Sequence, residues 1–370
     1  MVIAAIAGGL LGMIMPLSAR AEAGRTSVDW PTQALVGPEH DLKQSAQRLV
    51  EAGQYKAAAD TFKVLADIAK TTAVGAVARV RQADCLLEAG EYGRARRVYD
   101  EAASEYPFEL PYSHLIASLR ELADAYARGD ASMFGRTDRQ AARELYEFMI
   151  ELVPAGPATP ENMIRLAKLH LKDDDFDQAV ATYRKVLRQF PDSPQAPAAT
   201  LGVARASLAK ASDIRGNLPP VRSAFSEASR FLEKYPAHEL TDKARQLRDR
   251  AEKRLSENLL YLGKFYMRDA HRRPQVARRY LHDLVREYPE TQAAADAKQW
   301  LARLEKLPPS EADTADMPAS PEETITEKRE LPAPPDDGVA DETDAEKPQS
   351  EALDMEEKER VRKWLRPLDD

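Results

Sequence analysis

The sequence predicts an all-α protein made of stacked helical hairpins, and three observations support this fold class. Ala, Leu, Arg and Glu are abundant whereas β-branched residues are scarce, a composition that favours helices. The segment from Phe176 to Pro191 reads FDQAVATYRKVLRQFP. Its apolar residues recur every three or four positions, which predicts one amphipathic helix. The same pattern returns several times along the chain, so we expect a repeat protein.

The repeated helix has an aromatic residue at its start, Ala at +3, an aromatic residue at +7, an apolar residue at +10 and Pro at +15. These positions are Phe176, Ala179, Tyr183, Val186 and Pro191. The proline cannot continue a helix and moves the preceding residue out of the α conformation. The pattern is typical of the second helix of a tetratricopeptide repeat (TPR), a helical hairpin of about 34 residues.

About six such hairpins follow one another in a solenoid that should cover residues 41–306. The cleanest second copy is GEYGRARRVYDEAASEYP, which has identical spacings. Asp41 is expected to cap the first helix of the array, and residues 291–306 are expected to form the C-terminal capping helix that solenoids need. The expected units are about 41–70, 73–107, 111–154, 159–191, 194–236 and 239–289.

The N-terminal segment predicts export. Residues 1–17 carry no charged side chain, and small residues precede a cut between Ala21 and Glu22, which is the layout of a signal peptide over residues 1–21. A retained membrane anchor is the alternative, and a true start upstream of Met1 is another, because the segment lacks Lys and Arg. Residues 22–40 are expected to be a linker.

The C-terminal segment differs in composition from the repeats. Residues 308–370 hold 20 acidic and 8 basic side chains, whereas the whole chain has a net charge of −8, so the rest of the chain is slightly basic. Residues 307–350 are acidic and rich in proline, which predicts disorder. Residues 351–366 predict a short amphipathic helix. It is either a docking helix on a flexible tether or a helix that is marginal in isolation, with apolar residues Val361, Trp364, Leu365 and Leu368.

No motif predicts catalytic, cofactor-binding or metal-binding residues. The sequence lacks HExxH, CxxC, GxxxxGK[ST] and GxSxG motifs, its six histidines are scattered, and Cys85 is its single cysteine. We interpret Asp173–Asp175 as an acidic turn between helices. Because no basic stripe with interleaved aromatics is present, nucleic acid is not an expected partner. The sequence therefore predicts a scaffold that binds proteins and is not an enzyme.

The first helices of the hairpins are expected to line a groove for partner segments. The inward candidates are Lys43, Gln47, Asp84 and Lys168. Their charges are mixed, so they do not specify a class of peptide.

From about residue 175 to 305 the sequence resembles the BamD (YfiO-type) family of TPR proteins. The residues that carry the resemblance are YRKVL at 183–187, FPDSP at 190–194, FLEKYP at 231–236, LYLGKFY at 260–266 and LVREYPET at 284–291. The resemblance implies a scaffold at the periplasmic face of the outer membrane. It would bind the barrel-inserting subunit of the β-barrel assembly machinery and nascent outer-membrane proteins, and would reach the membrane through these partners. The alternative is a periplasmic TPR adaptor that coordinates cell-wall enzymes or Tol-Pal-type envelope complexes.

Overall fold

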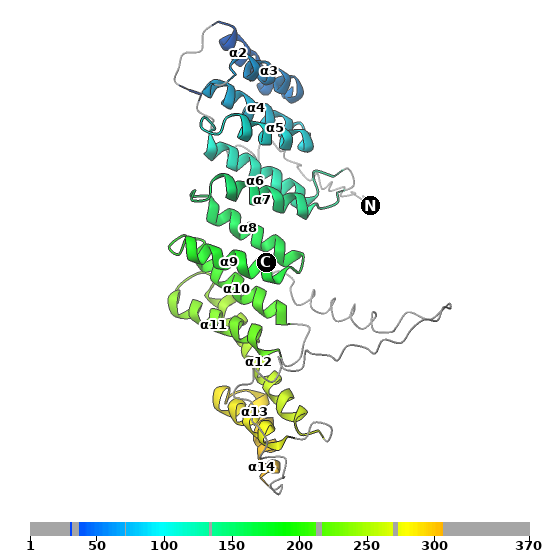
Figure 1. The fold of residues 1–370 in the computed structure, drawn as a ribbon, viewed down its shortest axis with the longest axis vertical. Helices are drawn as coiled ribbons and strands as arrows, with labels where there is room; N and C mark the ends of the chain where they lie inside the picture. The colour runs from blue at the N-terminus through cyan, green and yellow to red at the C-terminus, as the bar shows by residue number, and fades with distance from the viewer. Residues whose placement is uncertain are drawn as a thin grey trace, which may run out of the picture. The chain divides into compact units, whose positions relative to one another are not determined.

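The computed structural model describes residues 30–31, 37–70, 72–132, 135–211, 217–268 and 273–305. Within these residues it contains 13 α-helices, α2 to α14, and no strand, which confirms the predicted all-α class (Figure 1). The chain divides into two compact units, Met1–Leu169 and His170–Asp370. We describe each unit by itself.

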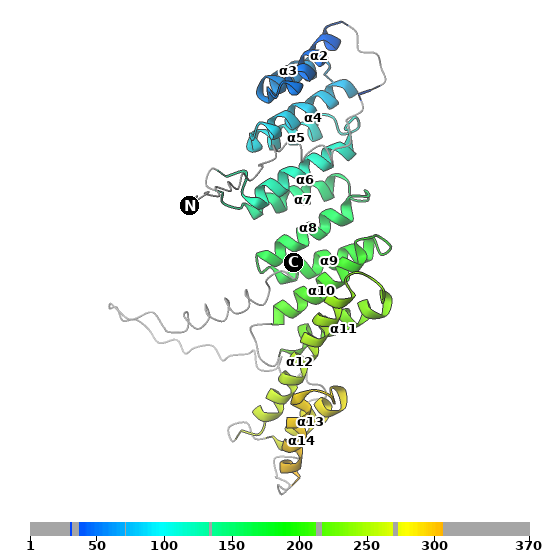
Figure 2. The same ribbon diagram turned by 180° about the vertical axis from the view of Figure 1, so that it is seen from behind.

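Unit 1 contains three helical hairpins in chain order. They are α2 (Pro38–Glu51) with α3 (Tyr55–Ile68), α4 (Ala73–Glu88) with α5 (Tyr92–Glu105), and α6 (Tyr112–Arg128) with α7 (Arg139–Leu152). Each of these helices packs against the next, and α4 also contacts α6 (Figures 1 and 2). The first helices of the second and third hairpins are therefore neighbours, as expected for stacked repeats. Helix α8 (Thr159–Lys172) crosses the division between the units.

Unit 2 continues the series and ends in a single helix. It contains α9 (Phe176–Gln189), α10 (Ala196–Lys210), α11 (Leu218–Lys234), α12 (Thr241–Phe265), α13 (Pro274–Glu287) and α14 (Gln292–Leu304). Helix α12 has 25 residues and packs against α10, α11, α13 and α14. This length exceeds that of the other helices in unit 2 that the structure describes, and α14 occupies the position of the expected capping helix.

Five second helices end in the same way, two residues before a proline. The residue between helix and proline has left the α region: φ and ψ are −129° and 51° at Tyr106, −134° and 56° at Phe190, and −132° and 54° at Tyr288. Val153 and Tyr235 adopt similar angles. The backbone N–H of each of these five residues still bonds to the carbonyl four residues earlier. The predicted proline stops are confirmed, and their cause is the steric restriction on the residue before proline.

The start of the first helix differs from the prediction. Helix α2 begins at Pro38 with Gly37 before it, so Asp41 lies in the first turn and is not the N-cap. Proline is favoured at a first helical position because the N–H it lacks has no partner there. Trp30, seven residues before Gly37, packs onto the same hairpin. Its ring centroid is 6.3 Å from that of Phe62, and Lys43 Nζ lies 4.6 Å from the Trp30 centroid.

The core explains why the repeats need small residues at fixed positions. The alanines at +3 of the second helices are 0–1% exposed, because a neighbouring helix lies directly against them. A Cβ added at Gly202 of α10 would lie 2.5 Å from the ring of Tyr183 on α9. Cys85 is also buried in the core. The +3 alanines are Ala58, Ala95, Ala142, Ala179, Ala224 and Ala277.

Several predicted features lie outside the described residues. These are the signal-cleavage residues Ala21 and Glu22, the whole of the acidic segment 307–350 and the docking-helix residues Val361, Trp364, Leu365 and Leu368. Among the helices that the structure describes, none combines the length and the apolar character needed to cross a bilayer.

Candidate interaction surfaces

A buried carboxylate joins three helices of unit 1. The side chain of Asp84 on α4 is 3% exposed. Its Oδ1 accepts hydrogen bonds from Tyr99 Oη of α5 at 2.8 Å and from Ser118 Oγ of α6 at 2.9 Å. Its Oδ2 lies 2.7 Å from Nε2 of His114 on α6 and accepts from Arg81 Nη1 at 3.2 Å. A buried carboxylate with four polar partners is well satisfied, so Asp84 ties its own hairpin to the next one.

This cluster contains the residue types of a Ser-His-Asp triad but not its geometry. In a triad one ring nitrogen of the histidine faces the carboxylate and the other faces the serine. Here Ser118 Oγ donates to the carboxylate itself, and it lies 3.5 Å from the same Nε2 that contacts Asp84. His114 and Ser118 are 3% and 0% exposed, which leaves no room for a substrate. The cluster therefore holds helices together.

The next hairpin repeats the arrangement in a more open setting. Asp124 Oδ1 on α6 accepts from Tyr146 Oη of α7 at 2.7 Å, and both its oxygens accept from Arg165 Nη1 of α8 at 3.2 and 3.0 Å. Its side chain is 34% exposed. Asp84 and Asp124 each directly follow an alanine in a first helix, and each accepts a hydrogen bond from the hydroxyl of the tyrosine at +7 of its own hairpin. The Asp-Tyr pair is thus a repeated bond between helices.

Sequence reasoning missed this role. Asp84 was expected to line an open groove, and that prediction is wrong because the side chain is enclosed between α4, α5 and α6. The sequence did contain a signal for this role. In both hairpins an Asp directly follows an Ala of the first helix, and a Tyr stands at +7 of the second helix. Lys168 and Gln47 are exposed, as a groove residue must be, and Lys43 is partly exposed beside Trp30.

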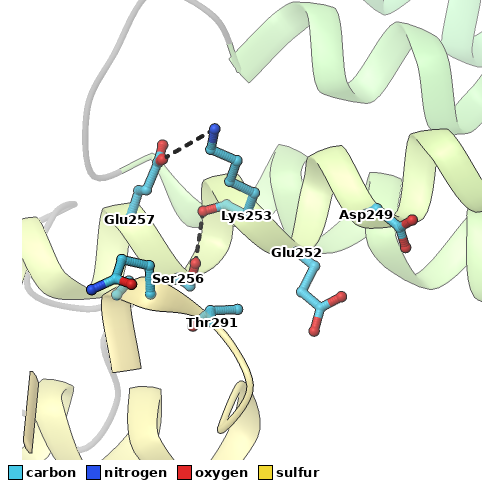
Figure 3. A pocket seen from close by; sticks show the side chains of 8 residues that line it. Asp249, Glu252, Lys253, Ser256, Glu257 and Thr291 are labelled. Carbon is cyan, nitrogen blue, oxygen red and sulfur yellow. Dashed lines mark hydrogen bonds and ion pairs between the residues drawn. The ribbon is translucent and has the colours of Figure 1, made fainter. Parts of the chain in front are cut away.

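In unit 2 a depression of about 230 Å³ lies between α12 and the start of α14 (Figure 3). Several of its polar side chains have local partners. Lys253 Nζ is 3.9 Å from Glu257 Oε1, and Arg248 donates to Asp249 at 2.7 Å. Thr291 Oγ1 accepts from the N–H of Ala294 and so caps α14. Helix capping and ion pairs at the surface therefore account for these polar side chains. The lining residues are Asp249, Glu252, Lys253, Ser256, Glu257, Thr291, Gln292 and Ala293.

A second feature of unit 2 has a different composition, aromatic and basic. Tyr261, Lys264 and Phe265 lie at the end of α12, and Trp300 and Arg303 lie on α14. Lys264 Nζ is 5.9 Å and Arg303 Cζ 5.2 Å from the centroid of the Trp300 ring, and the rings of Tyr261 and Phe265 are 6.3 Å apart. The uncharged members are all partly exposed. We call these five residues the Trp300 surface, and they have the composition of a surface that binds peptides.

Histidines and acids do not gather into a metal centre in the part of the chain that the structure describes, where no group of three potential ligands is found. His170 is buried, with Nδ1 3.7 Å from Asp175 Oδ2. Asp173–Asp175 form the turn between α8 and α9, with Asp174 at a φ of 61°.

The buried tyrosines give the fold a defined response to alkaline pH. Burial raises the pKa of Tyr183 and Tyr146 above the usual value of 10, and the nearby Asp124 carboxylate raises the pKa of Tyr146 further. The folded state then holds these protons more tightly than the unfolded state. The stability that they contribute is complete below pH 10 and is lost as the pH rises above it.

We therefore expect the free energy of unfolding to fall above pH 10, by about 1.4 kcal/mol per pH unit for each buried tyrosine. In Tyr183→Phe the slope of this decline should be smaller by about 1.4 kcal/mol per pH unit, because the variant has no phenol to ionise at this position. Urea unfolding from pH 9 to 11, followed by circular dichroism, measures the slope. An unchanged slope in Tyr183→Phe would contradict the assignment.

Comparisons with known proteins agree with this architecture. A family model described as "Tetratricopeptide repeat" matches residues 44–109, and the YfiO model, described as "Outer membrane lipoprotein", matches residues 120–307. No curated protein matches the chain.

Solved structures similar to this chain include the following three proteins. A tetratricopeptide repeat protein from Parabacteroides merdae shares 14% identity over 72% of this chain and 99% of its own, with a TM-score of 0.35. BtubC from P. vanneervenii shares 16% identity over 77% and 99%, with a TM-score of 0.32. PilW, a type IV pilus biogenesis factor, shares 13% over 71% and 100%, with a TM-score of 0.28. Because these TM-scores are low, we draw no conclusion about fold or function from the three structures.

The stacked hairpins, the proline stops and the repeat model define a TPR helical solenoid, whose function is to bind other proteins. The YfiO model covers half of the chain. The chain belongs to the YfiO family of outer membrane lipoproteins, which is the BamD-type family that the sequence resembles. The repeat fold and the family are those of non-catalytic scaffolds, and the family is consistent with a place in the cell envelope.

Proposed function

We propose that this protein is a BamD-like component that assists the assembly of outer-membrane β-barrel proteins. The observation that carries the proposal is the match of the YfiO model to residues 120–307, a range that extends from α6 to just past α14. The Trp300 surface supports it, because the same range presents aromatic and basic side chains at the end of the solenoid. The scaffold is exported and works at the periplasmic face of the outer membrane.

In this role the protein binds the barrel-inserting subunit and nascent barrel proteins through its repeats. The chemistry required is recognition alone, which the solenoid supplies through half-exposed residues on rigid helices. The acidic segment and the docking-helix residues Val361, Trp364, Leu365 and Leu368 would add a second contact with the assembly through a flexible tether.

The test is recovery of partners from the membrane fraction of cells that produce the tagged full chain, after mild cross-linking. We expect the β-barrel-inserting subunit to be enriched, and depletion of the protein to lower the amounts of barrel proteins in the outer membrane. Recovery of peptidoglycan enzymes or Tol-Pal components without that subunit would overturn the proposal in favour of a cell-wall adaptor.

The matched control removes residues 351–370 and leaves the solenoid unchanged. Weaker recovery of the same partner would support a docking role for Val361, Trp364, Leu365 and Leu368. Equal recovery would discard that role without affecting the scaffold proposal, because the solenoid alone would then account for binding.

A further inference from the structure

The Trp300 surface has two cations whose charges are not matched by acids. Lys264 and Arg303 lie against the ring of Trp300, and neither forms an ion pair with a carboxylate within residues 37–305 as far as the structure describes them. Other Arg side chains in unit 2, such as Arg245 with Asp242 and Arg286 with Asp283, form ordinary local ion pairs. The cations beside Trp300 are therefore available to an anionic ligand.

The aromatic members define the rest of the ligand. Trp300 is partly exposed at the end of the solenoid, and its neighbour Leu301 is partly exposed as well. Tyr261 lies one turn before Lys264 on α12, its ring is 6.3 Å from that of Phe265, and it packs against the same core cluster as Trp300. Proline-rich segments bind to such rings because the pyrrolidine ring packs flat on an aromatic face and the extended helix is already ordered before binding. A ligand that suits the whole surface combines prolines with carboxylates.

This chain contains such a segment a short distance after α14. Leu331–Asp337 reads LPAPPDD, three prolines followed by two aspartates. It begins 27 residues after Leu304, the last residue of α14. A random-coil chain of that length would span about 30 Å on average, and Trp300 and Arg303 lie in the last two turns of α14. The tether gives an effective concentration in the millimolar range, so even a weak site would be filled.

We propose that the Trp300 surface is a binding site for acidic proline-rich segments and that its resident occupant is Leu331–Asp337 of the same chain. The prolines pack on Trp300 and Tyr261, and the carboxylates of Asp336 and Asp337 pair with Lys264 and Arg303. A partner of the same chemistry must displace this segment to bind. This intramolecular binding raises the concentration or affinity that a partner needs in order to bind. The effect does not depend on which assembly the scaffold serves.

The test is zero-length carbodiimide cross-linking of the full chain at low micromolar concentration, followed by mass spectrometry of the monomer band. The reagent joins an amine to a carboxylate only when the two are in contact. We expect an amide between Lys264 Nζ and Asp336 or Asp337. Lys298, exposed on α14 but two residues from Trp300 and so on another side of the helix, is the matched control and should give no such product.

Two variants separate binding from folding. Trp300→Leu keeps an apolar residue and should lower the yield of the Lys264 product by about five-fold or more, as expected when stacking and cation-π contacts are lost. Pro334→Ser with Pro335→Ser changes only the tethered segment, so it leaves the solenoid intact and should lower the yield to a similar extent. Circular dichroism of each variant checks that its helix content is unchanged.

Three outcomes would overturn the proposal. Lys264 could join carboxylates throughout the acidic segment at equal yield, which would show attraction without a site. The product could occur only in cross-linked dimers, which would make a second copy the occupant. Lys264 could also give no product with Asp336 or Asp337, which would leave the surface to an external partner.

Discussion

Asp84→Ala is expected to lower the free energy of unfolding of unit 1 by about 3–5 kcal/mol. The substitution removes the acceptor for four side chains at once and leaves His114, Ser118 and Tyr99 buried without it. Each donor that stays buried and unsatisfied carries a desolvation penalty of about 1–3 kcal/mol. Hydrogen exchange measured by mass spectrometry resolves the two units, and it should show lost protection in α4, α5 and α6 while α10 to α14 keep theirs.

The matched control is Asp124→Ala, at the same position of the next hairpin. Asp124 also accepts from the +7 tyrosine and from a side chain of the following helix, but its side chain is 34% exposed. Water can replace the lost acceptor there, so the expected cost is about 1–2 kcal/mol. Equal costs for the two variants would show that burial is not what makes Asp84 important.

Gly202→Ala is expected to destabilise unit 2 by about 1–3 kcal/mol, the usual cost of overpacking. The new Cβ would lie 2.5 Å from Cε1 and Cζ of the Tyr183 ring. That ring is 2% exposed and cannot rotate away without moving α9 against α10. Thermal and urea unfolding of the full chain measure the change, and protection of α9 and α10 against hydrogen exchange should fall first.

Two further variants test the cause. Gly93→Ala on α5 adds a Cβ that meets no atom within 4 Å, so it should be neutral or stabilise by up to about 1 kcal/mol through lower backbone entropy. In a Tyr183→Leu background the added cost of Gly202→Ala should shrink, because the ring that it meets is gone. If the destabilisation by Gly202→Ala were the same with and without the Tyr183 ring, a clash with that ring would not be its cause.

The sequence was sufficient for the fold because the information for it is local. The +3 alanines, the +7 aromatics and the proline stops lie within single helices, and each constrains its own hairpin. The stop at Pro191 shows this directly, since Phe190 takes the conformation expected of any residue before proline. The wrong prediction of Asp41 as the N-cap of α2 also concerns local information. Pro38 is a favoured first helical residue, and it could have been recognised as the start of the helix from the sequence.

The interaction surfaces could not be predicted in the same way, because they depend on the rotation of one helix against another. Asp84 meets Tyr99 and Ser118, which are 15 and 34 residues away, and no periodicity within α4 tells whether that face is open or covered. Lys264 and Trp300 lie on different helices, α12 and α14. Their contact follows from the packing of these two helices, which the pattern of either helix does not specify.

The proline-terminated helices have a consequence for how this array tolerates change. Since each of these five helices is stopped by its own backbone chemistry, its end does not depend on the length of the segment that follows or precedes the hairpin. The longer connectors, after Arg128 in the third hairpin and after Lys210 in the fifth, show that extra residues are accommodated there without altering the terminators at Pro154 and Pro236. We therefore expect these two connectors to accept insertions. Longer loops, reporter sequences or binding loops can be added there without changing where the helices of the hairpins end.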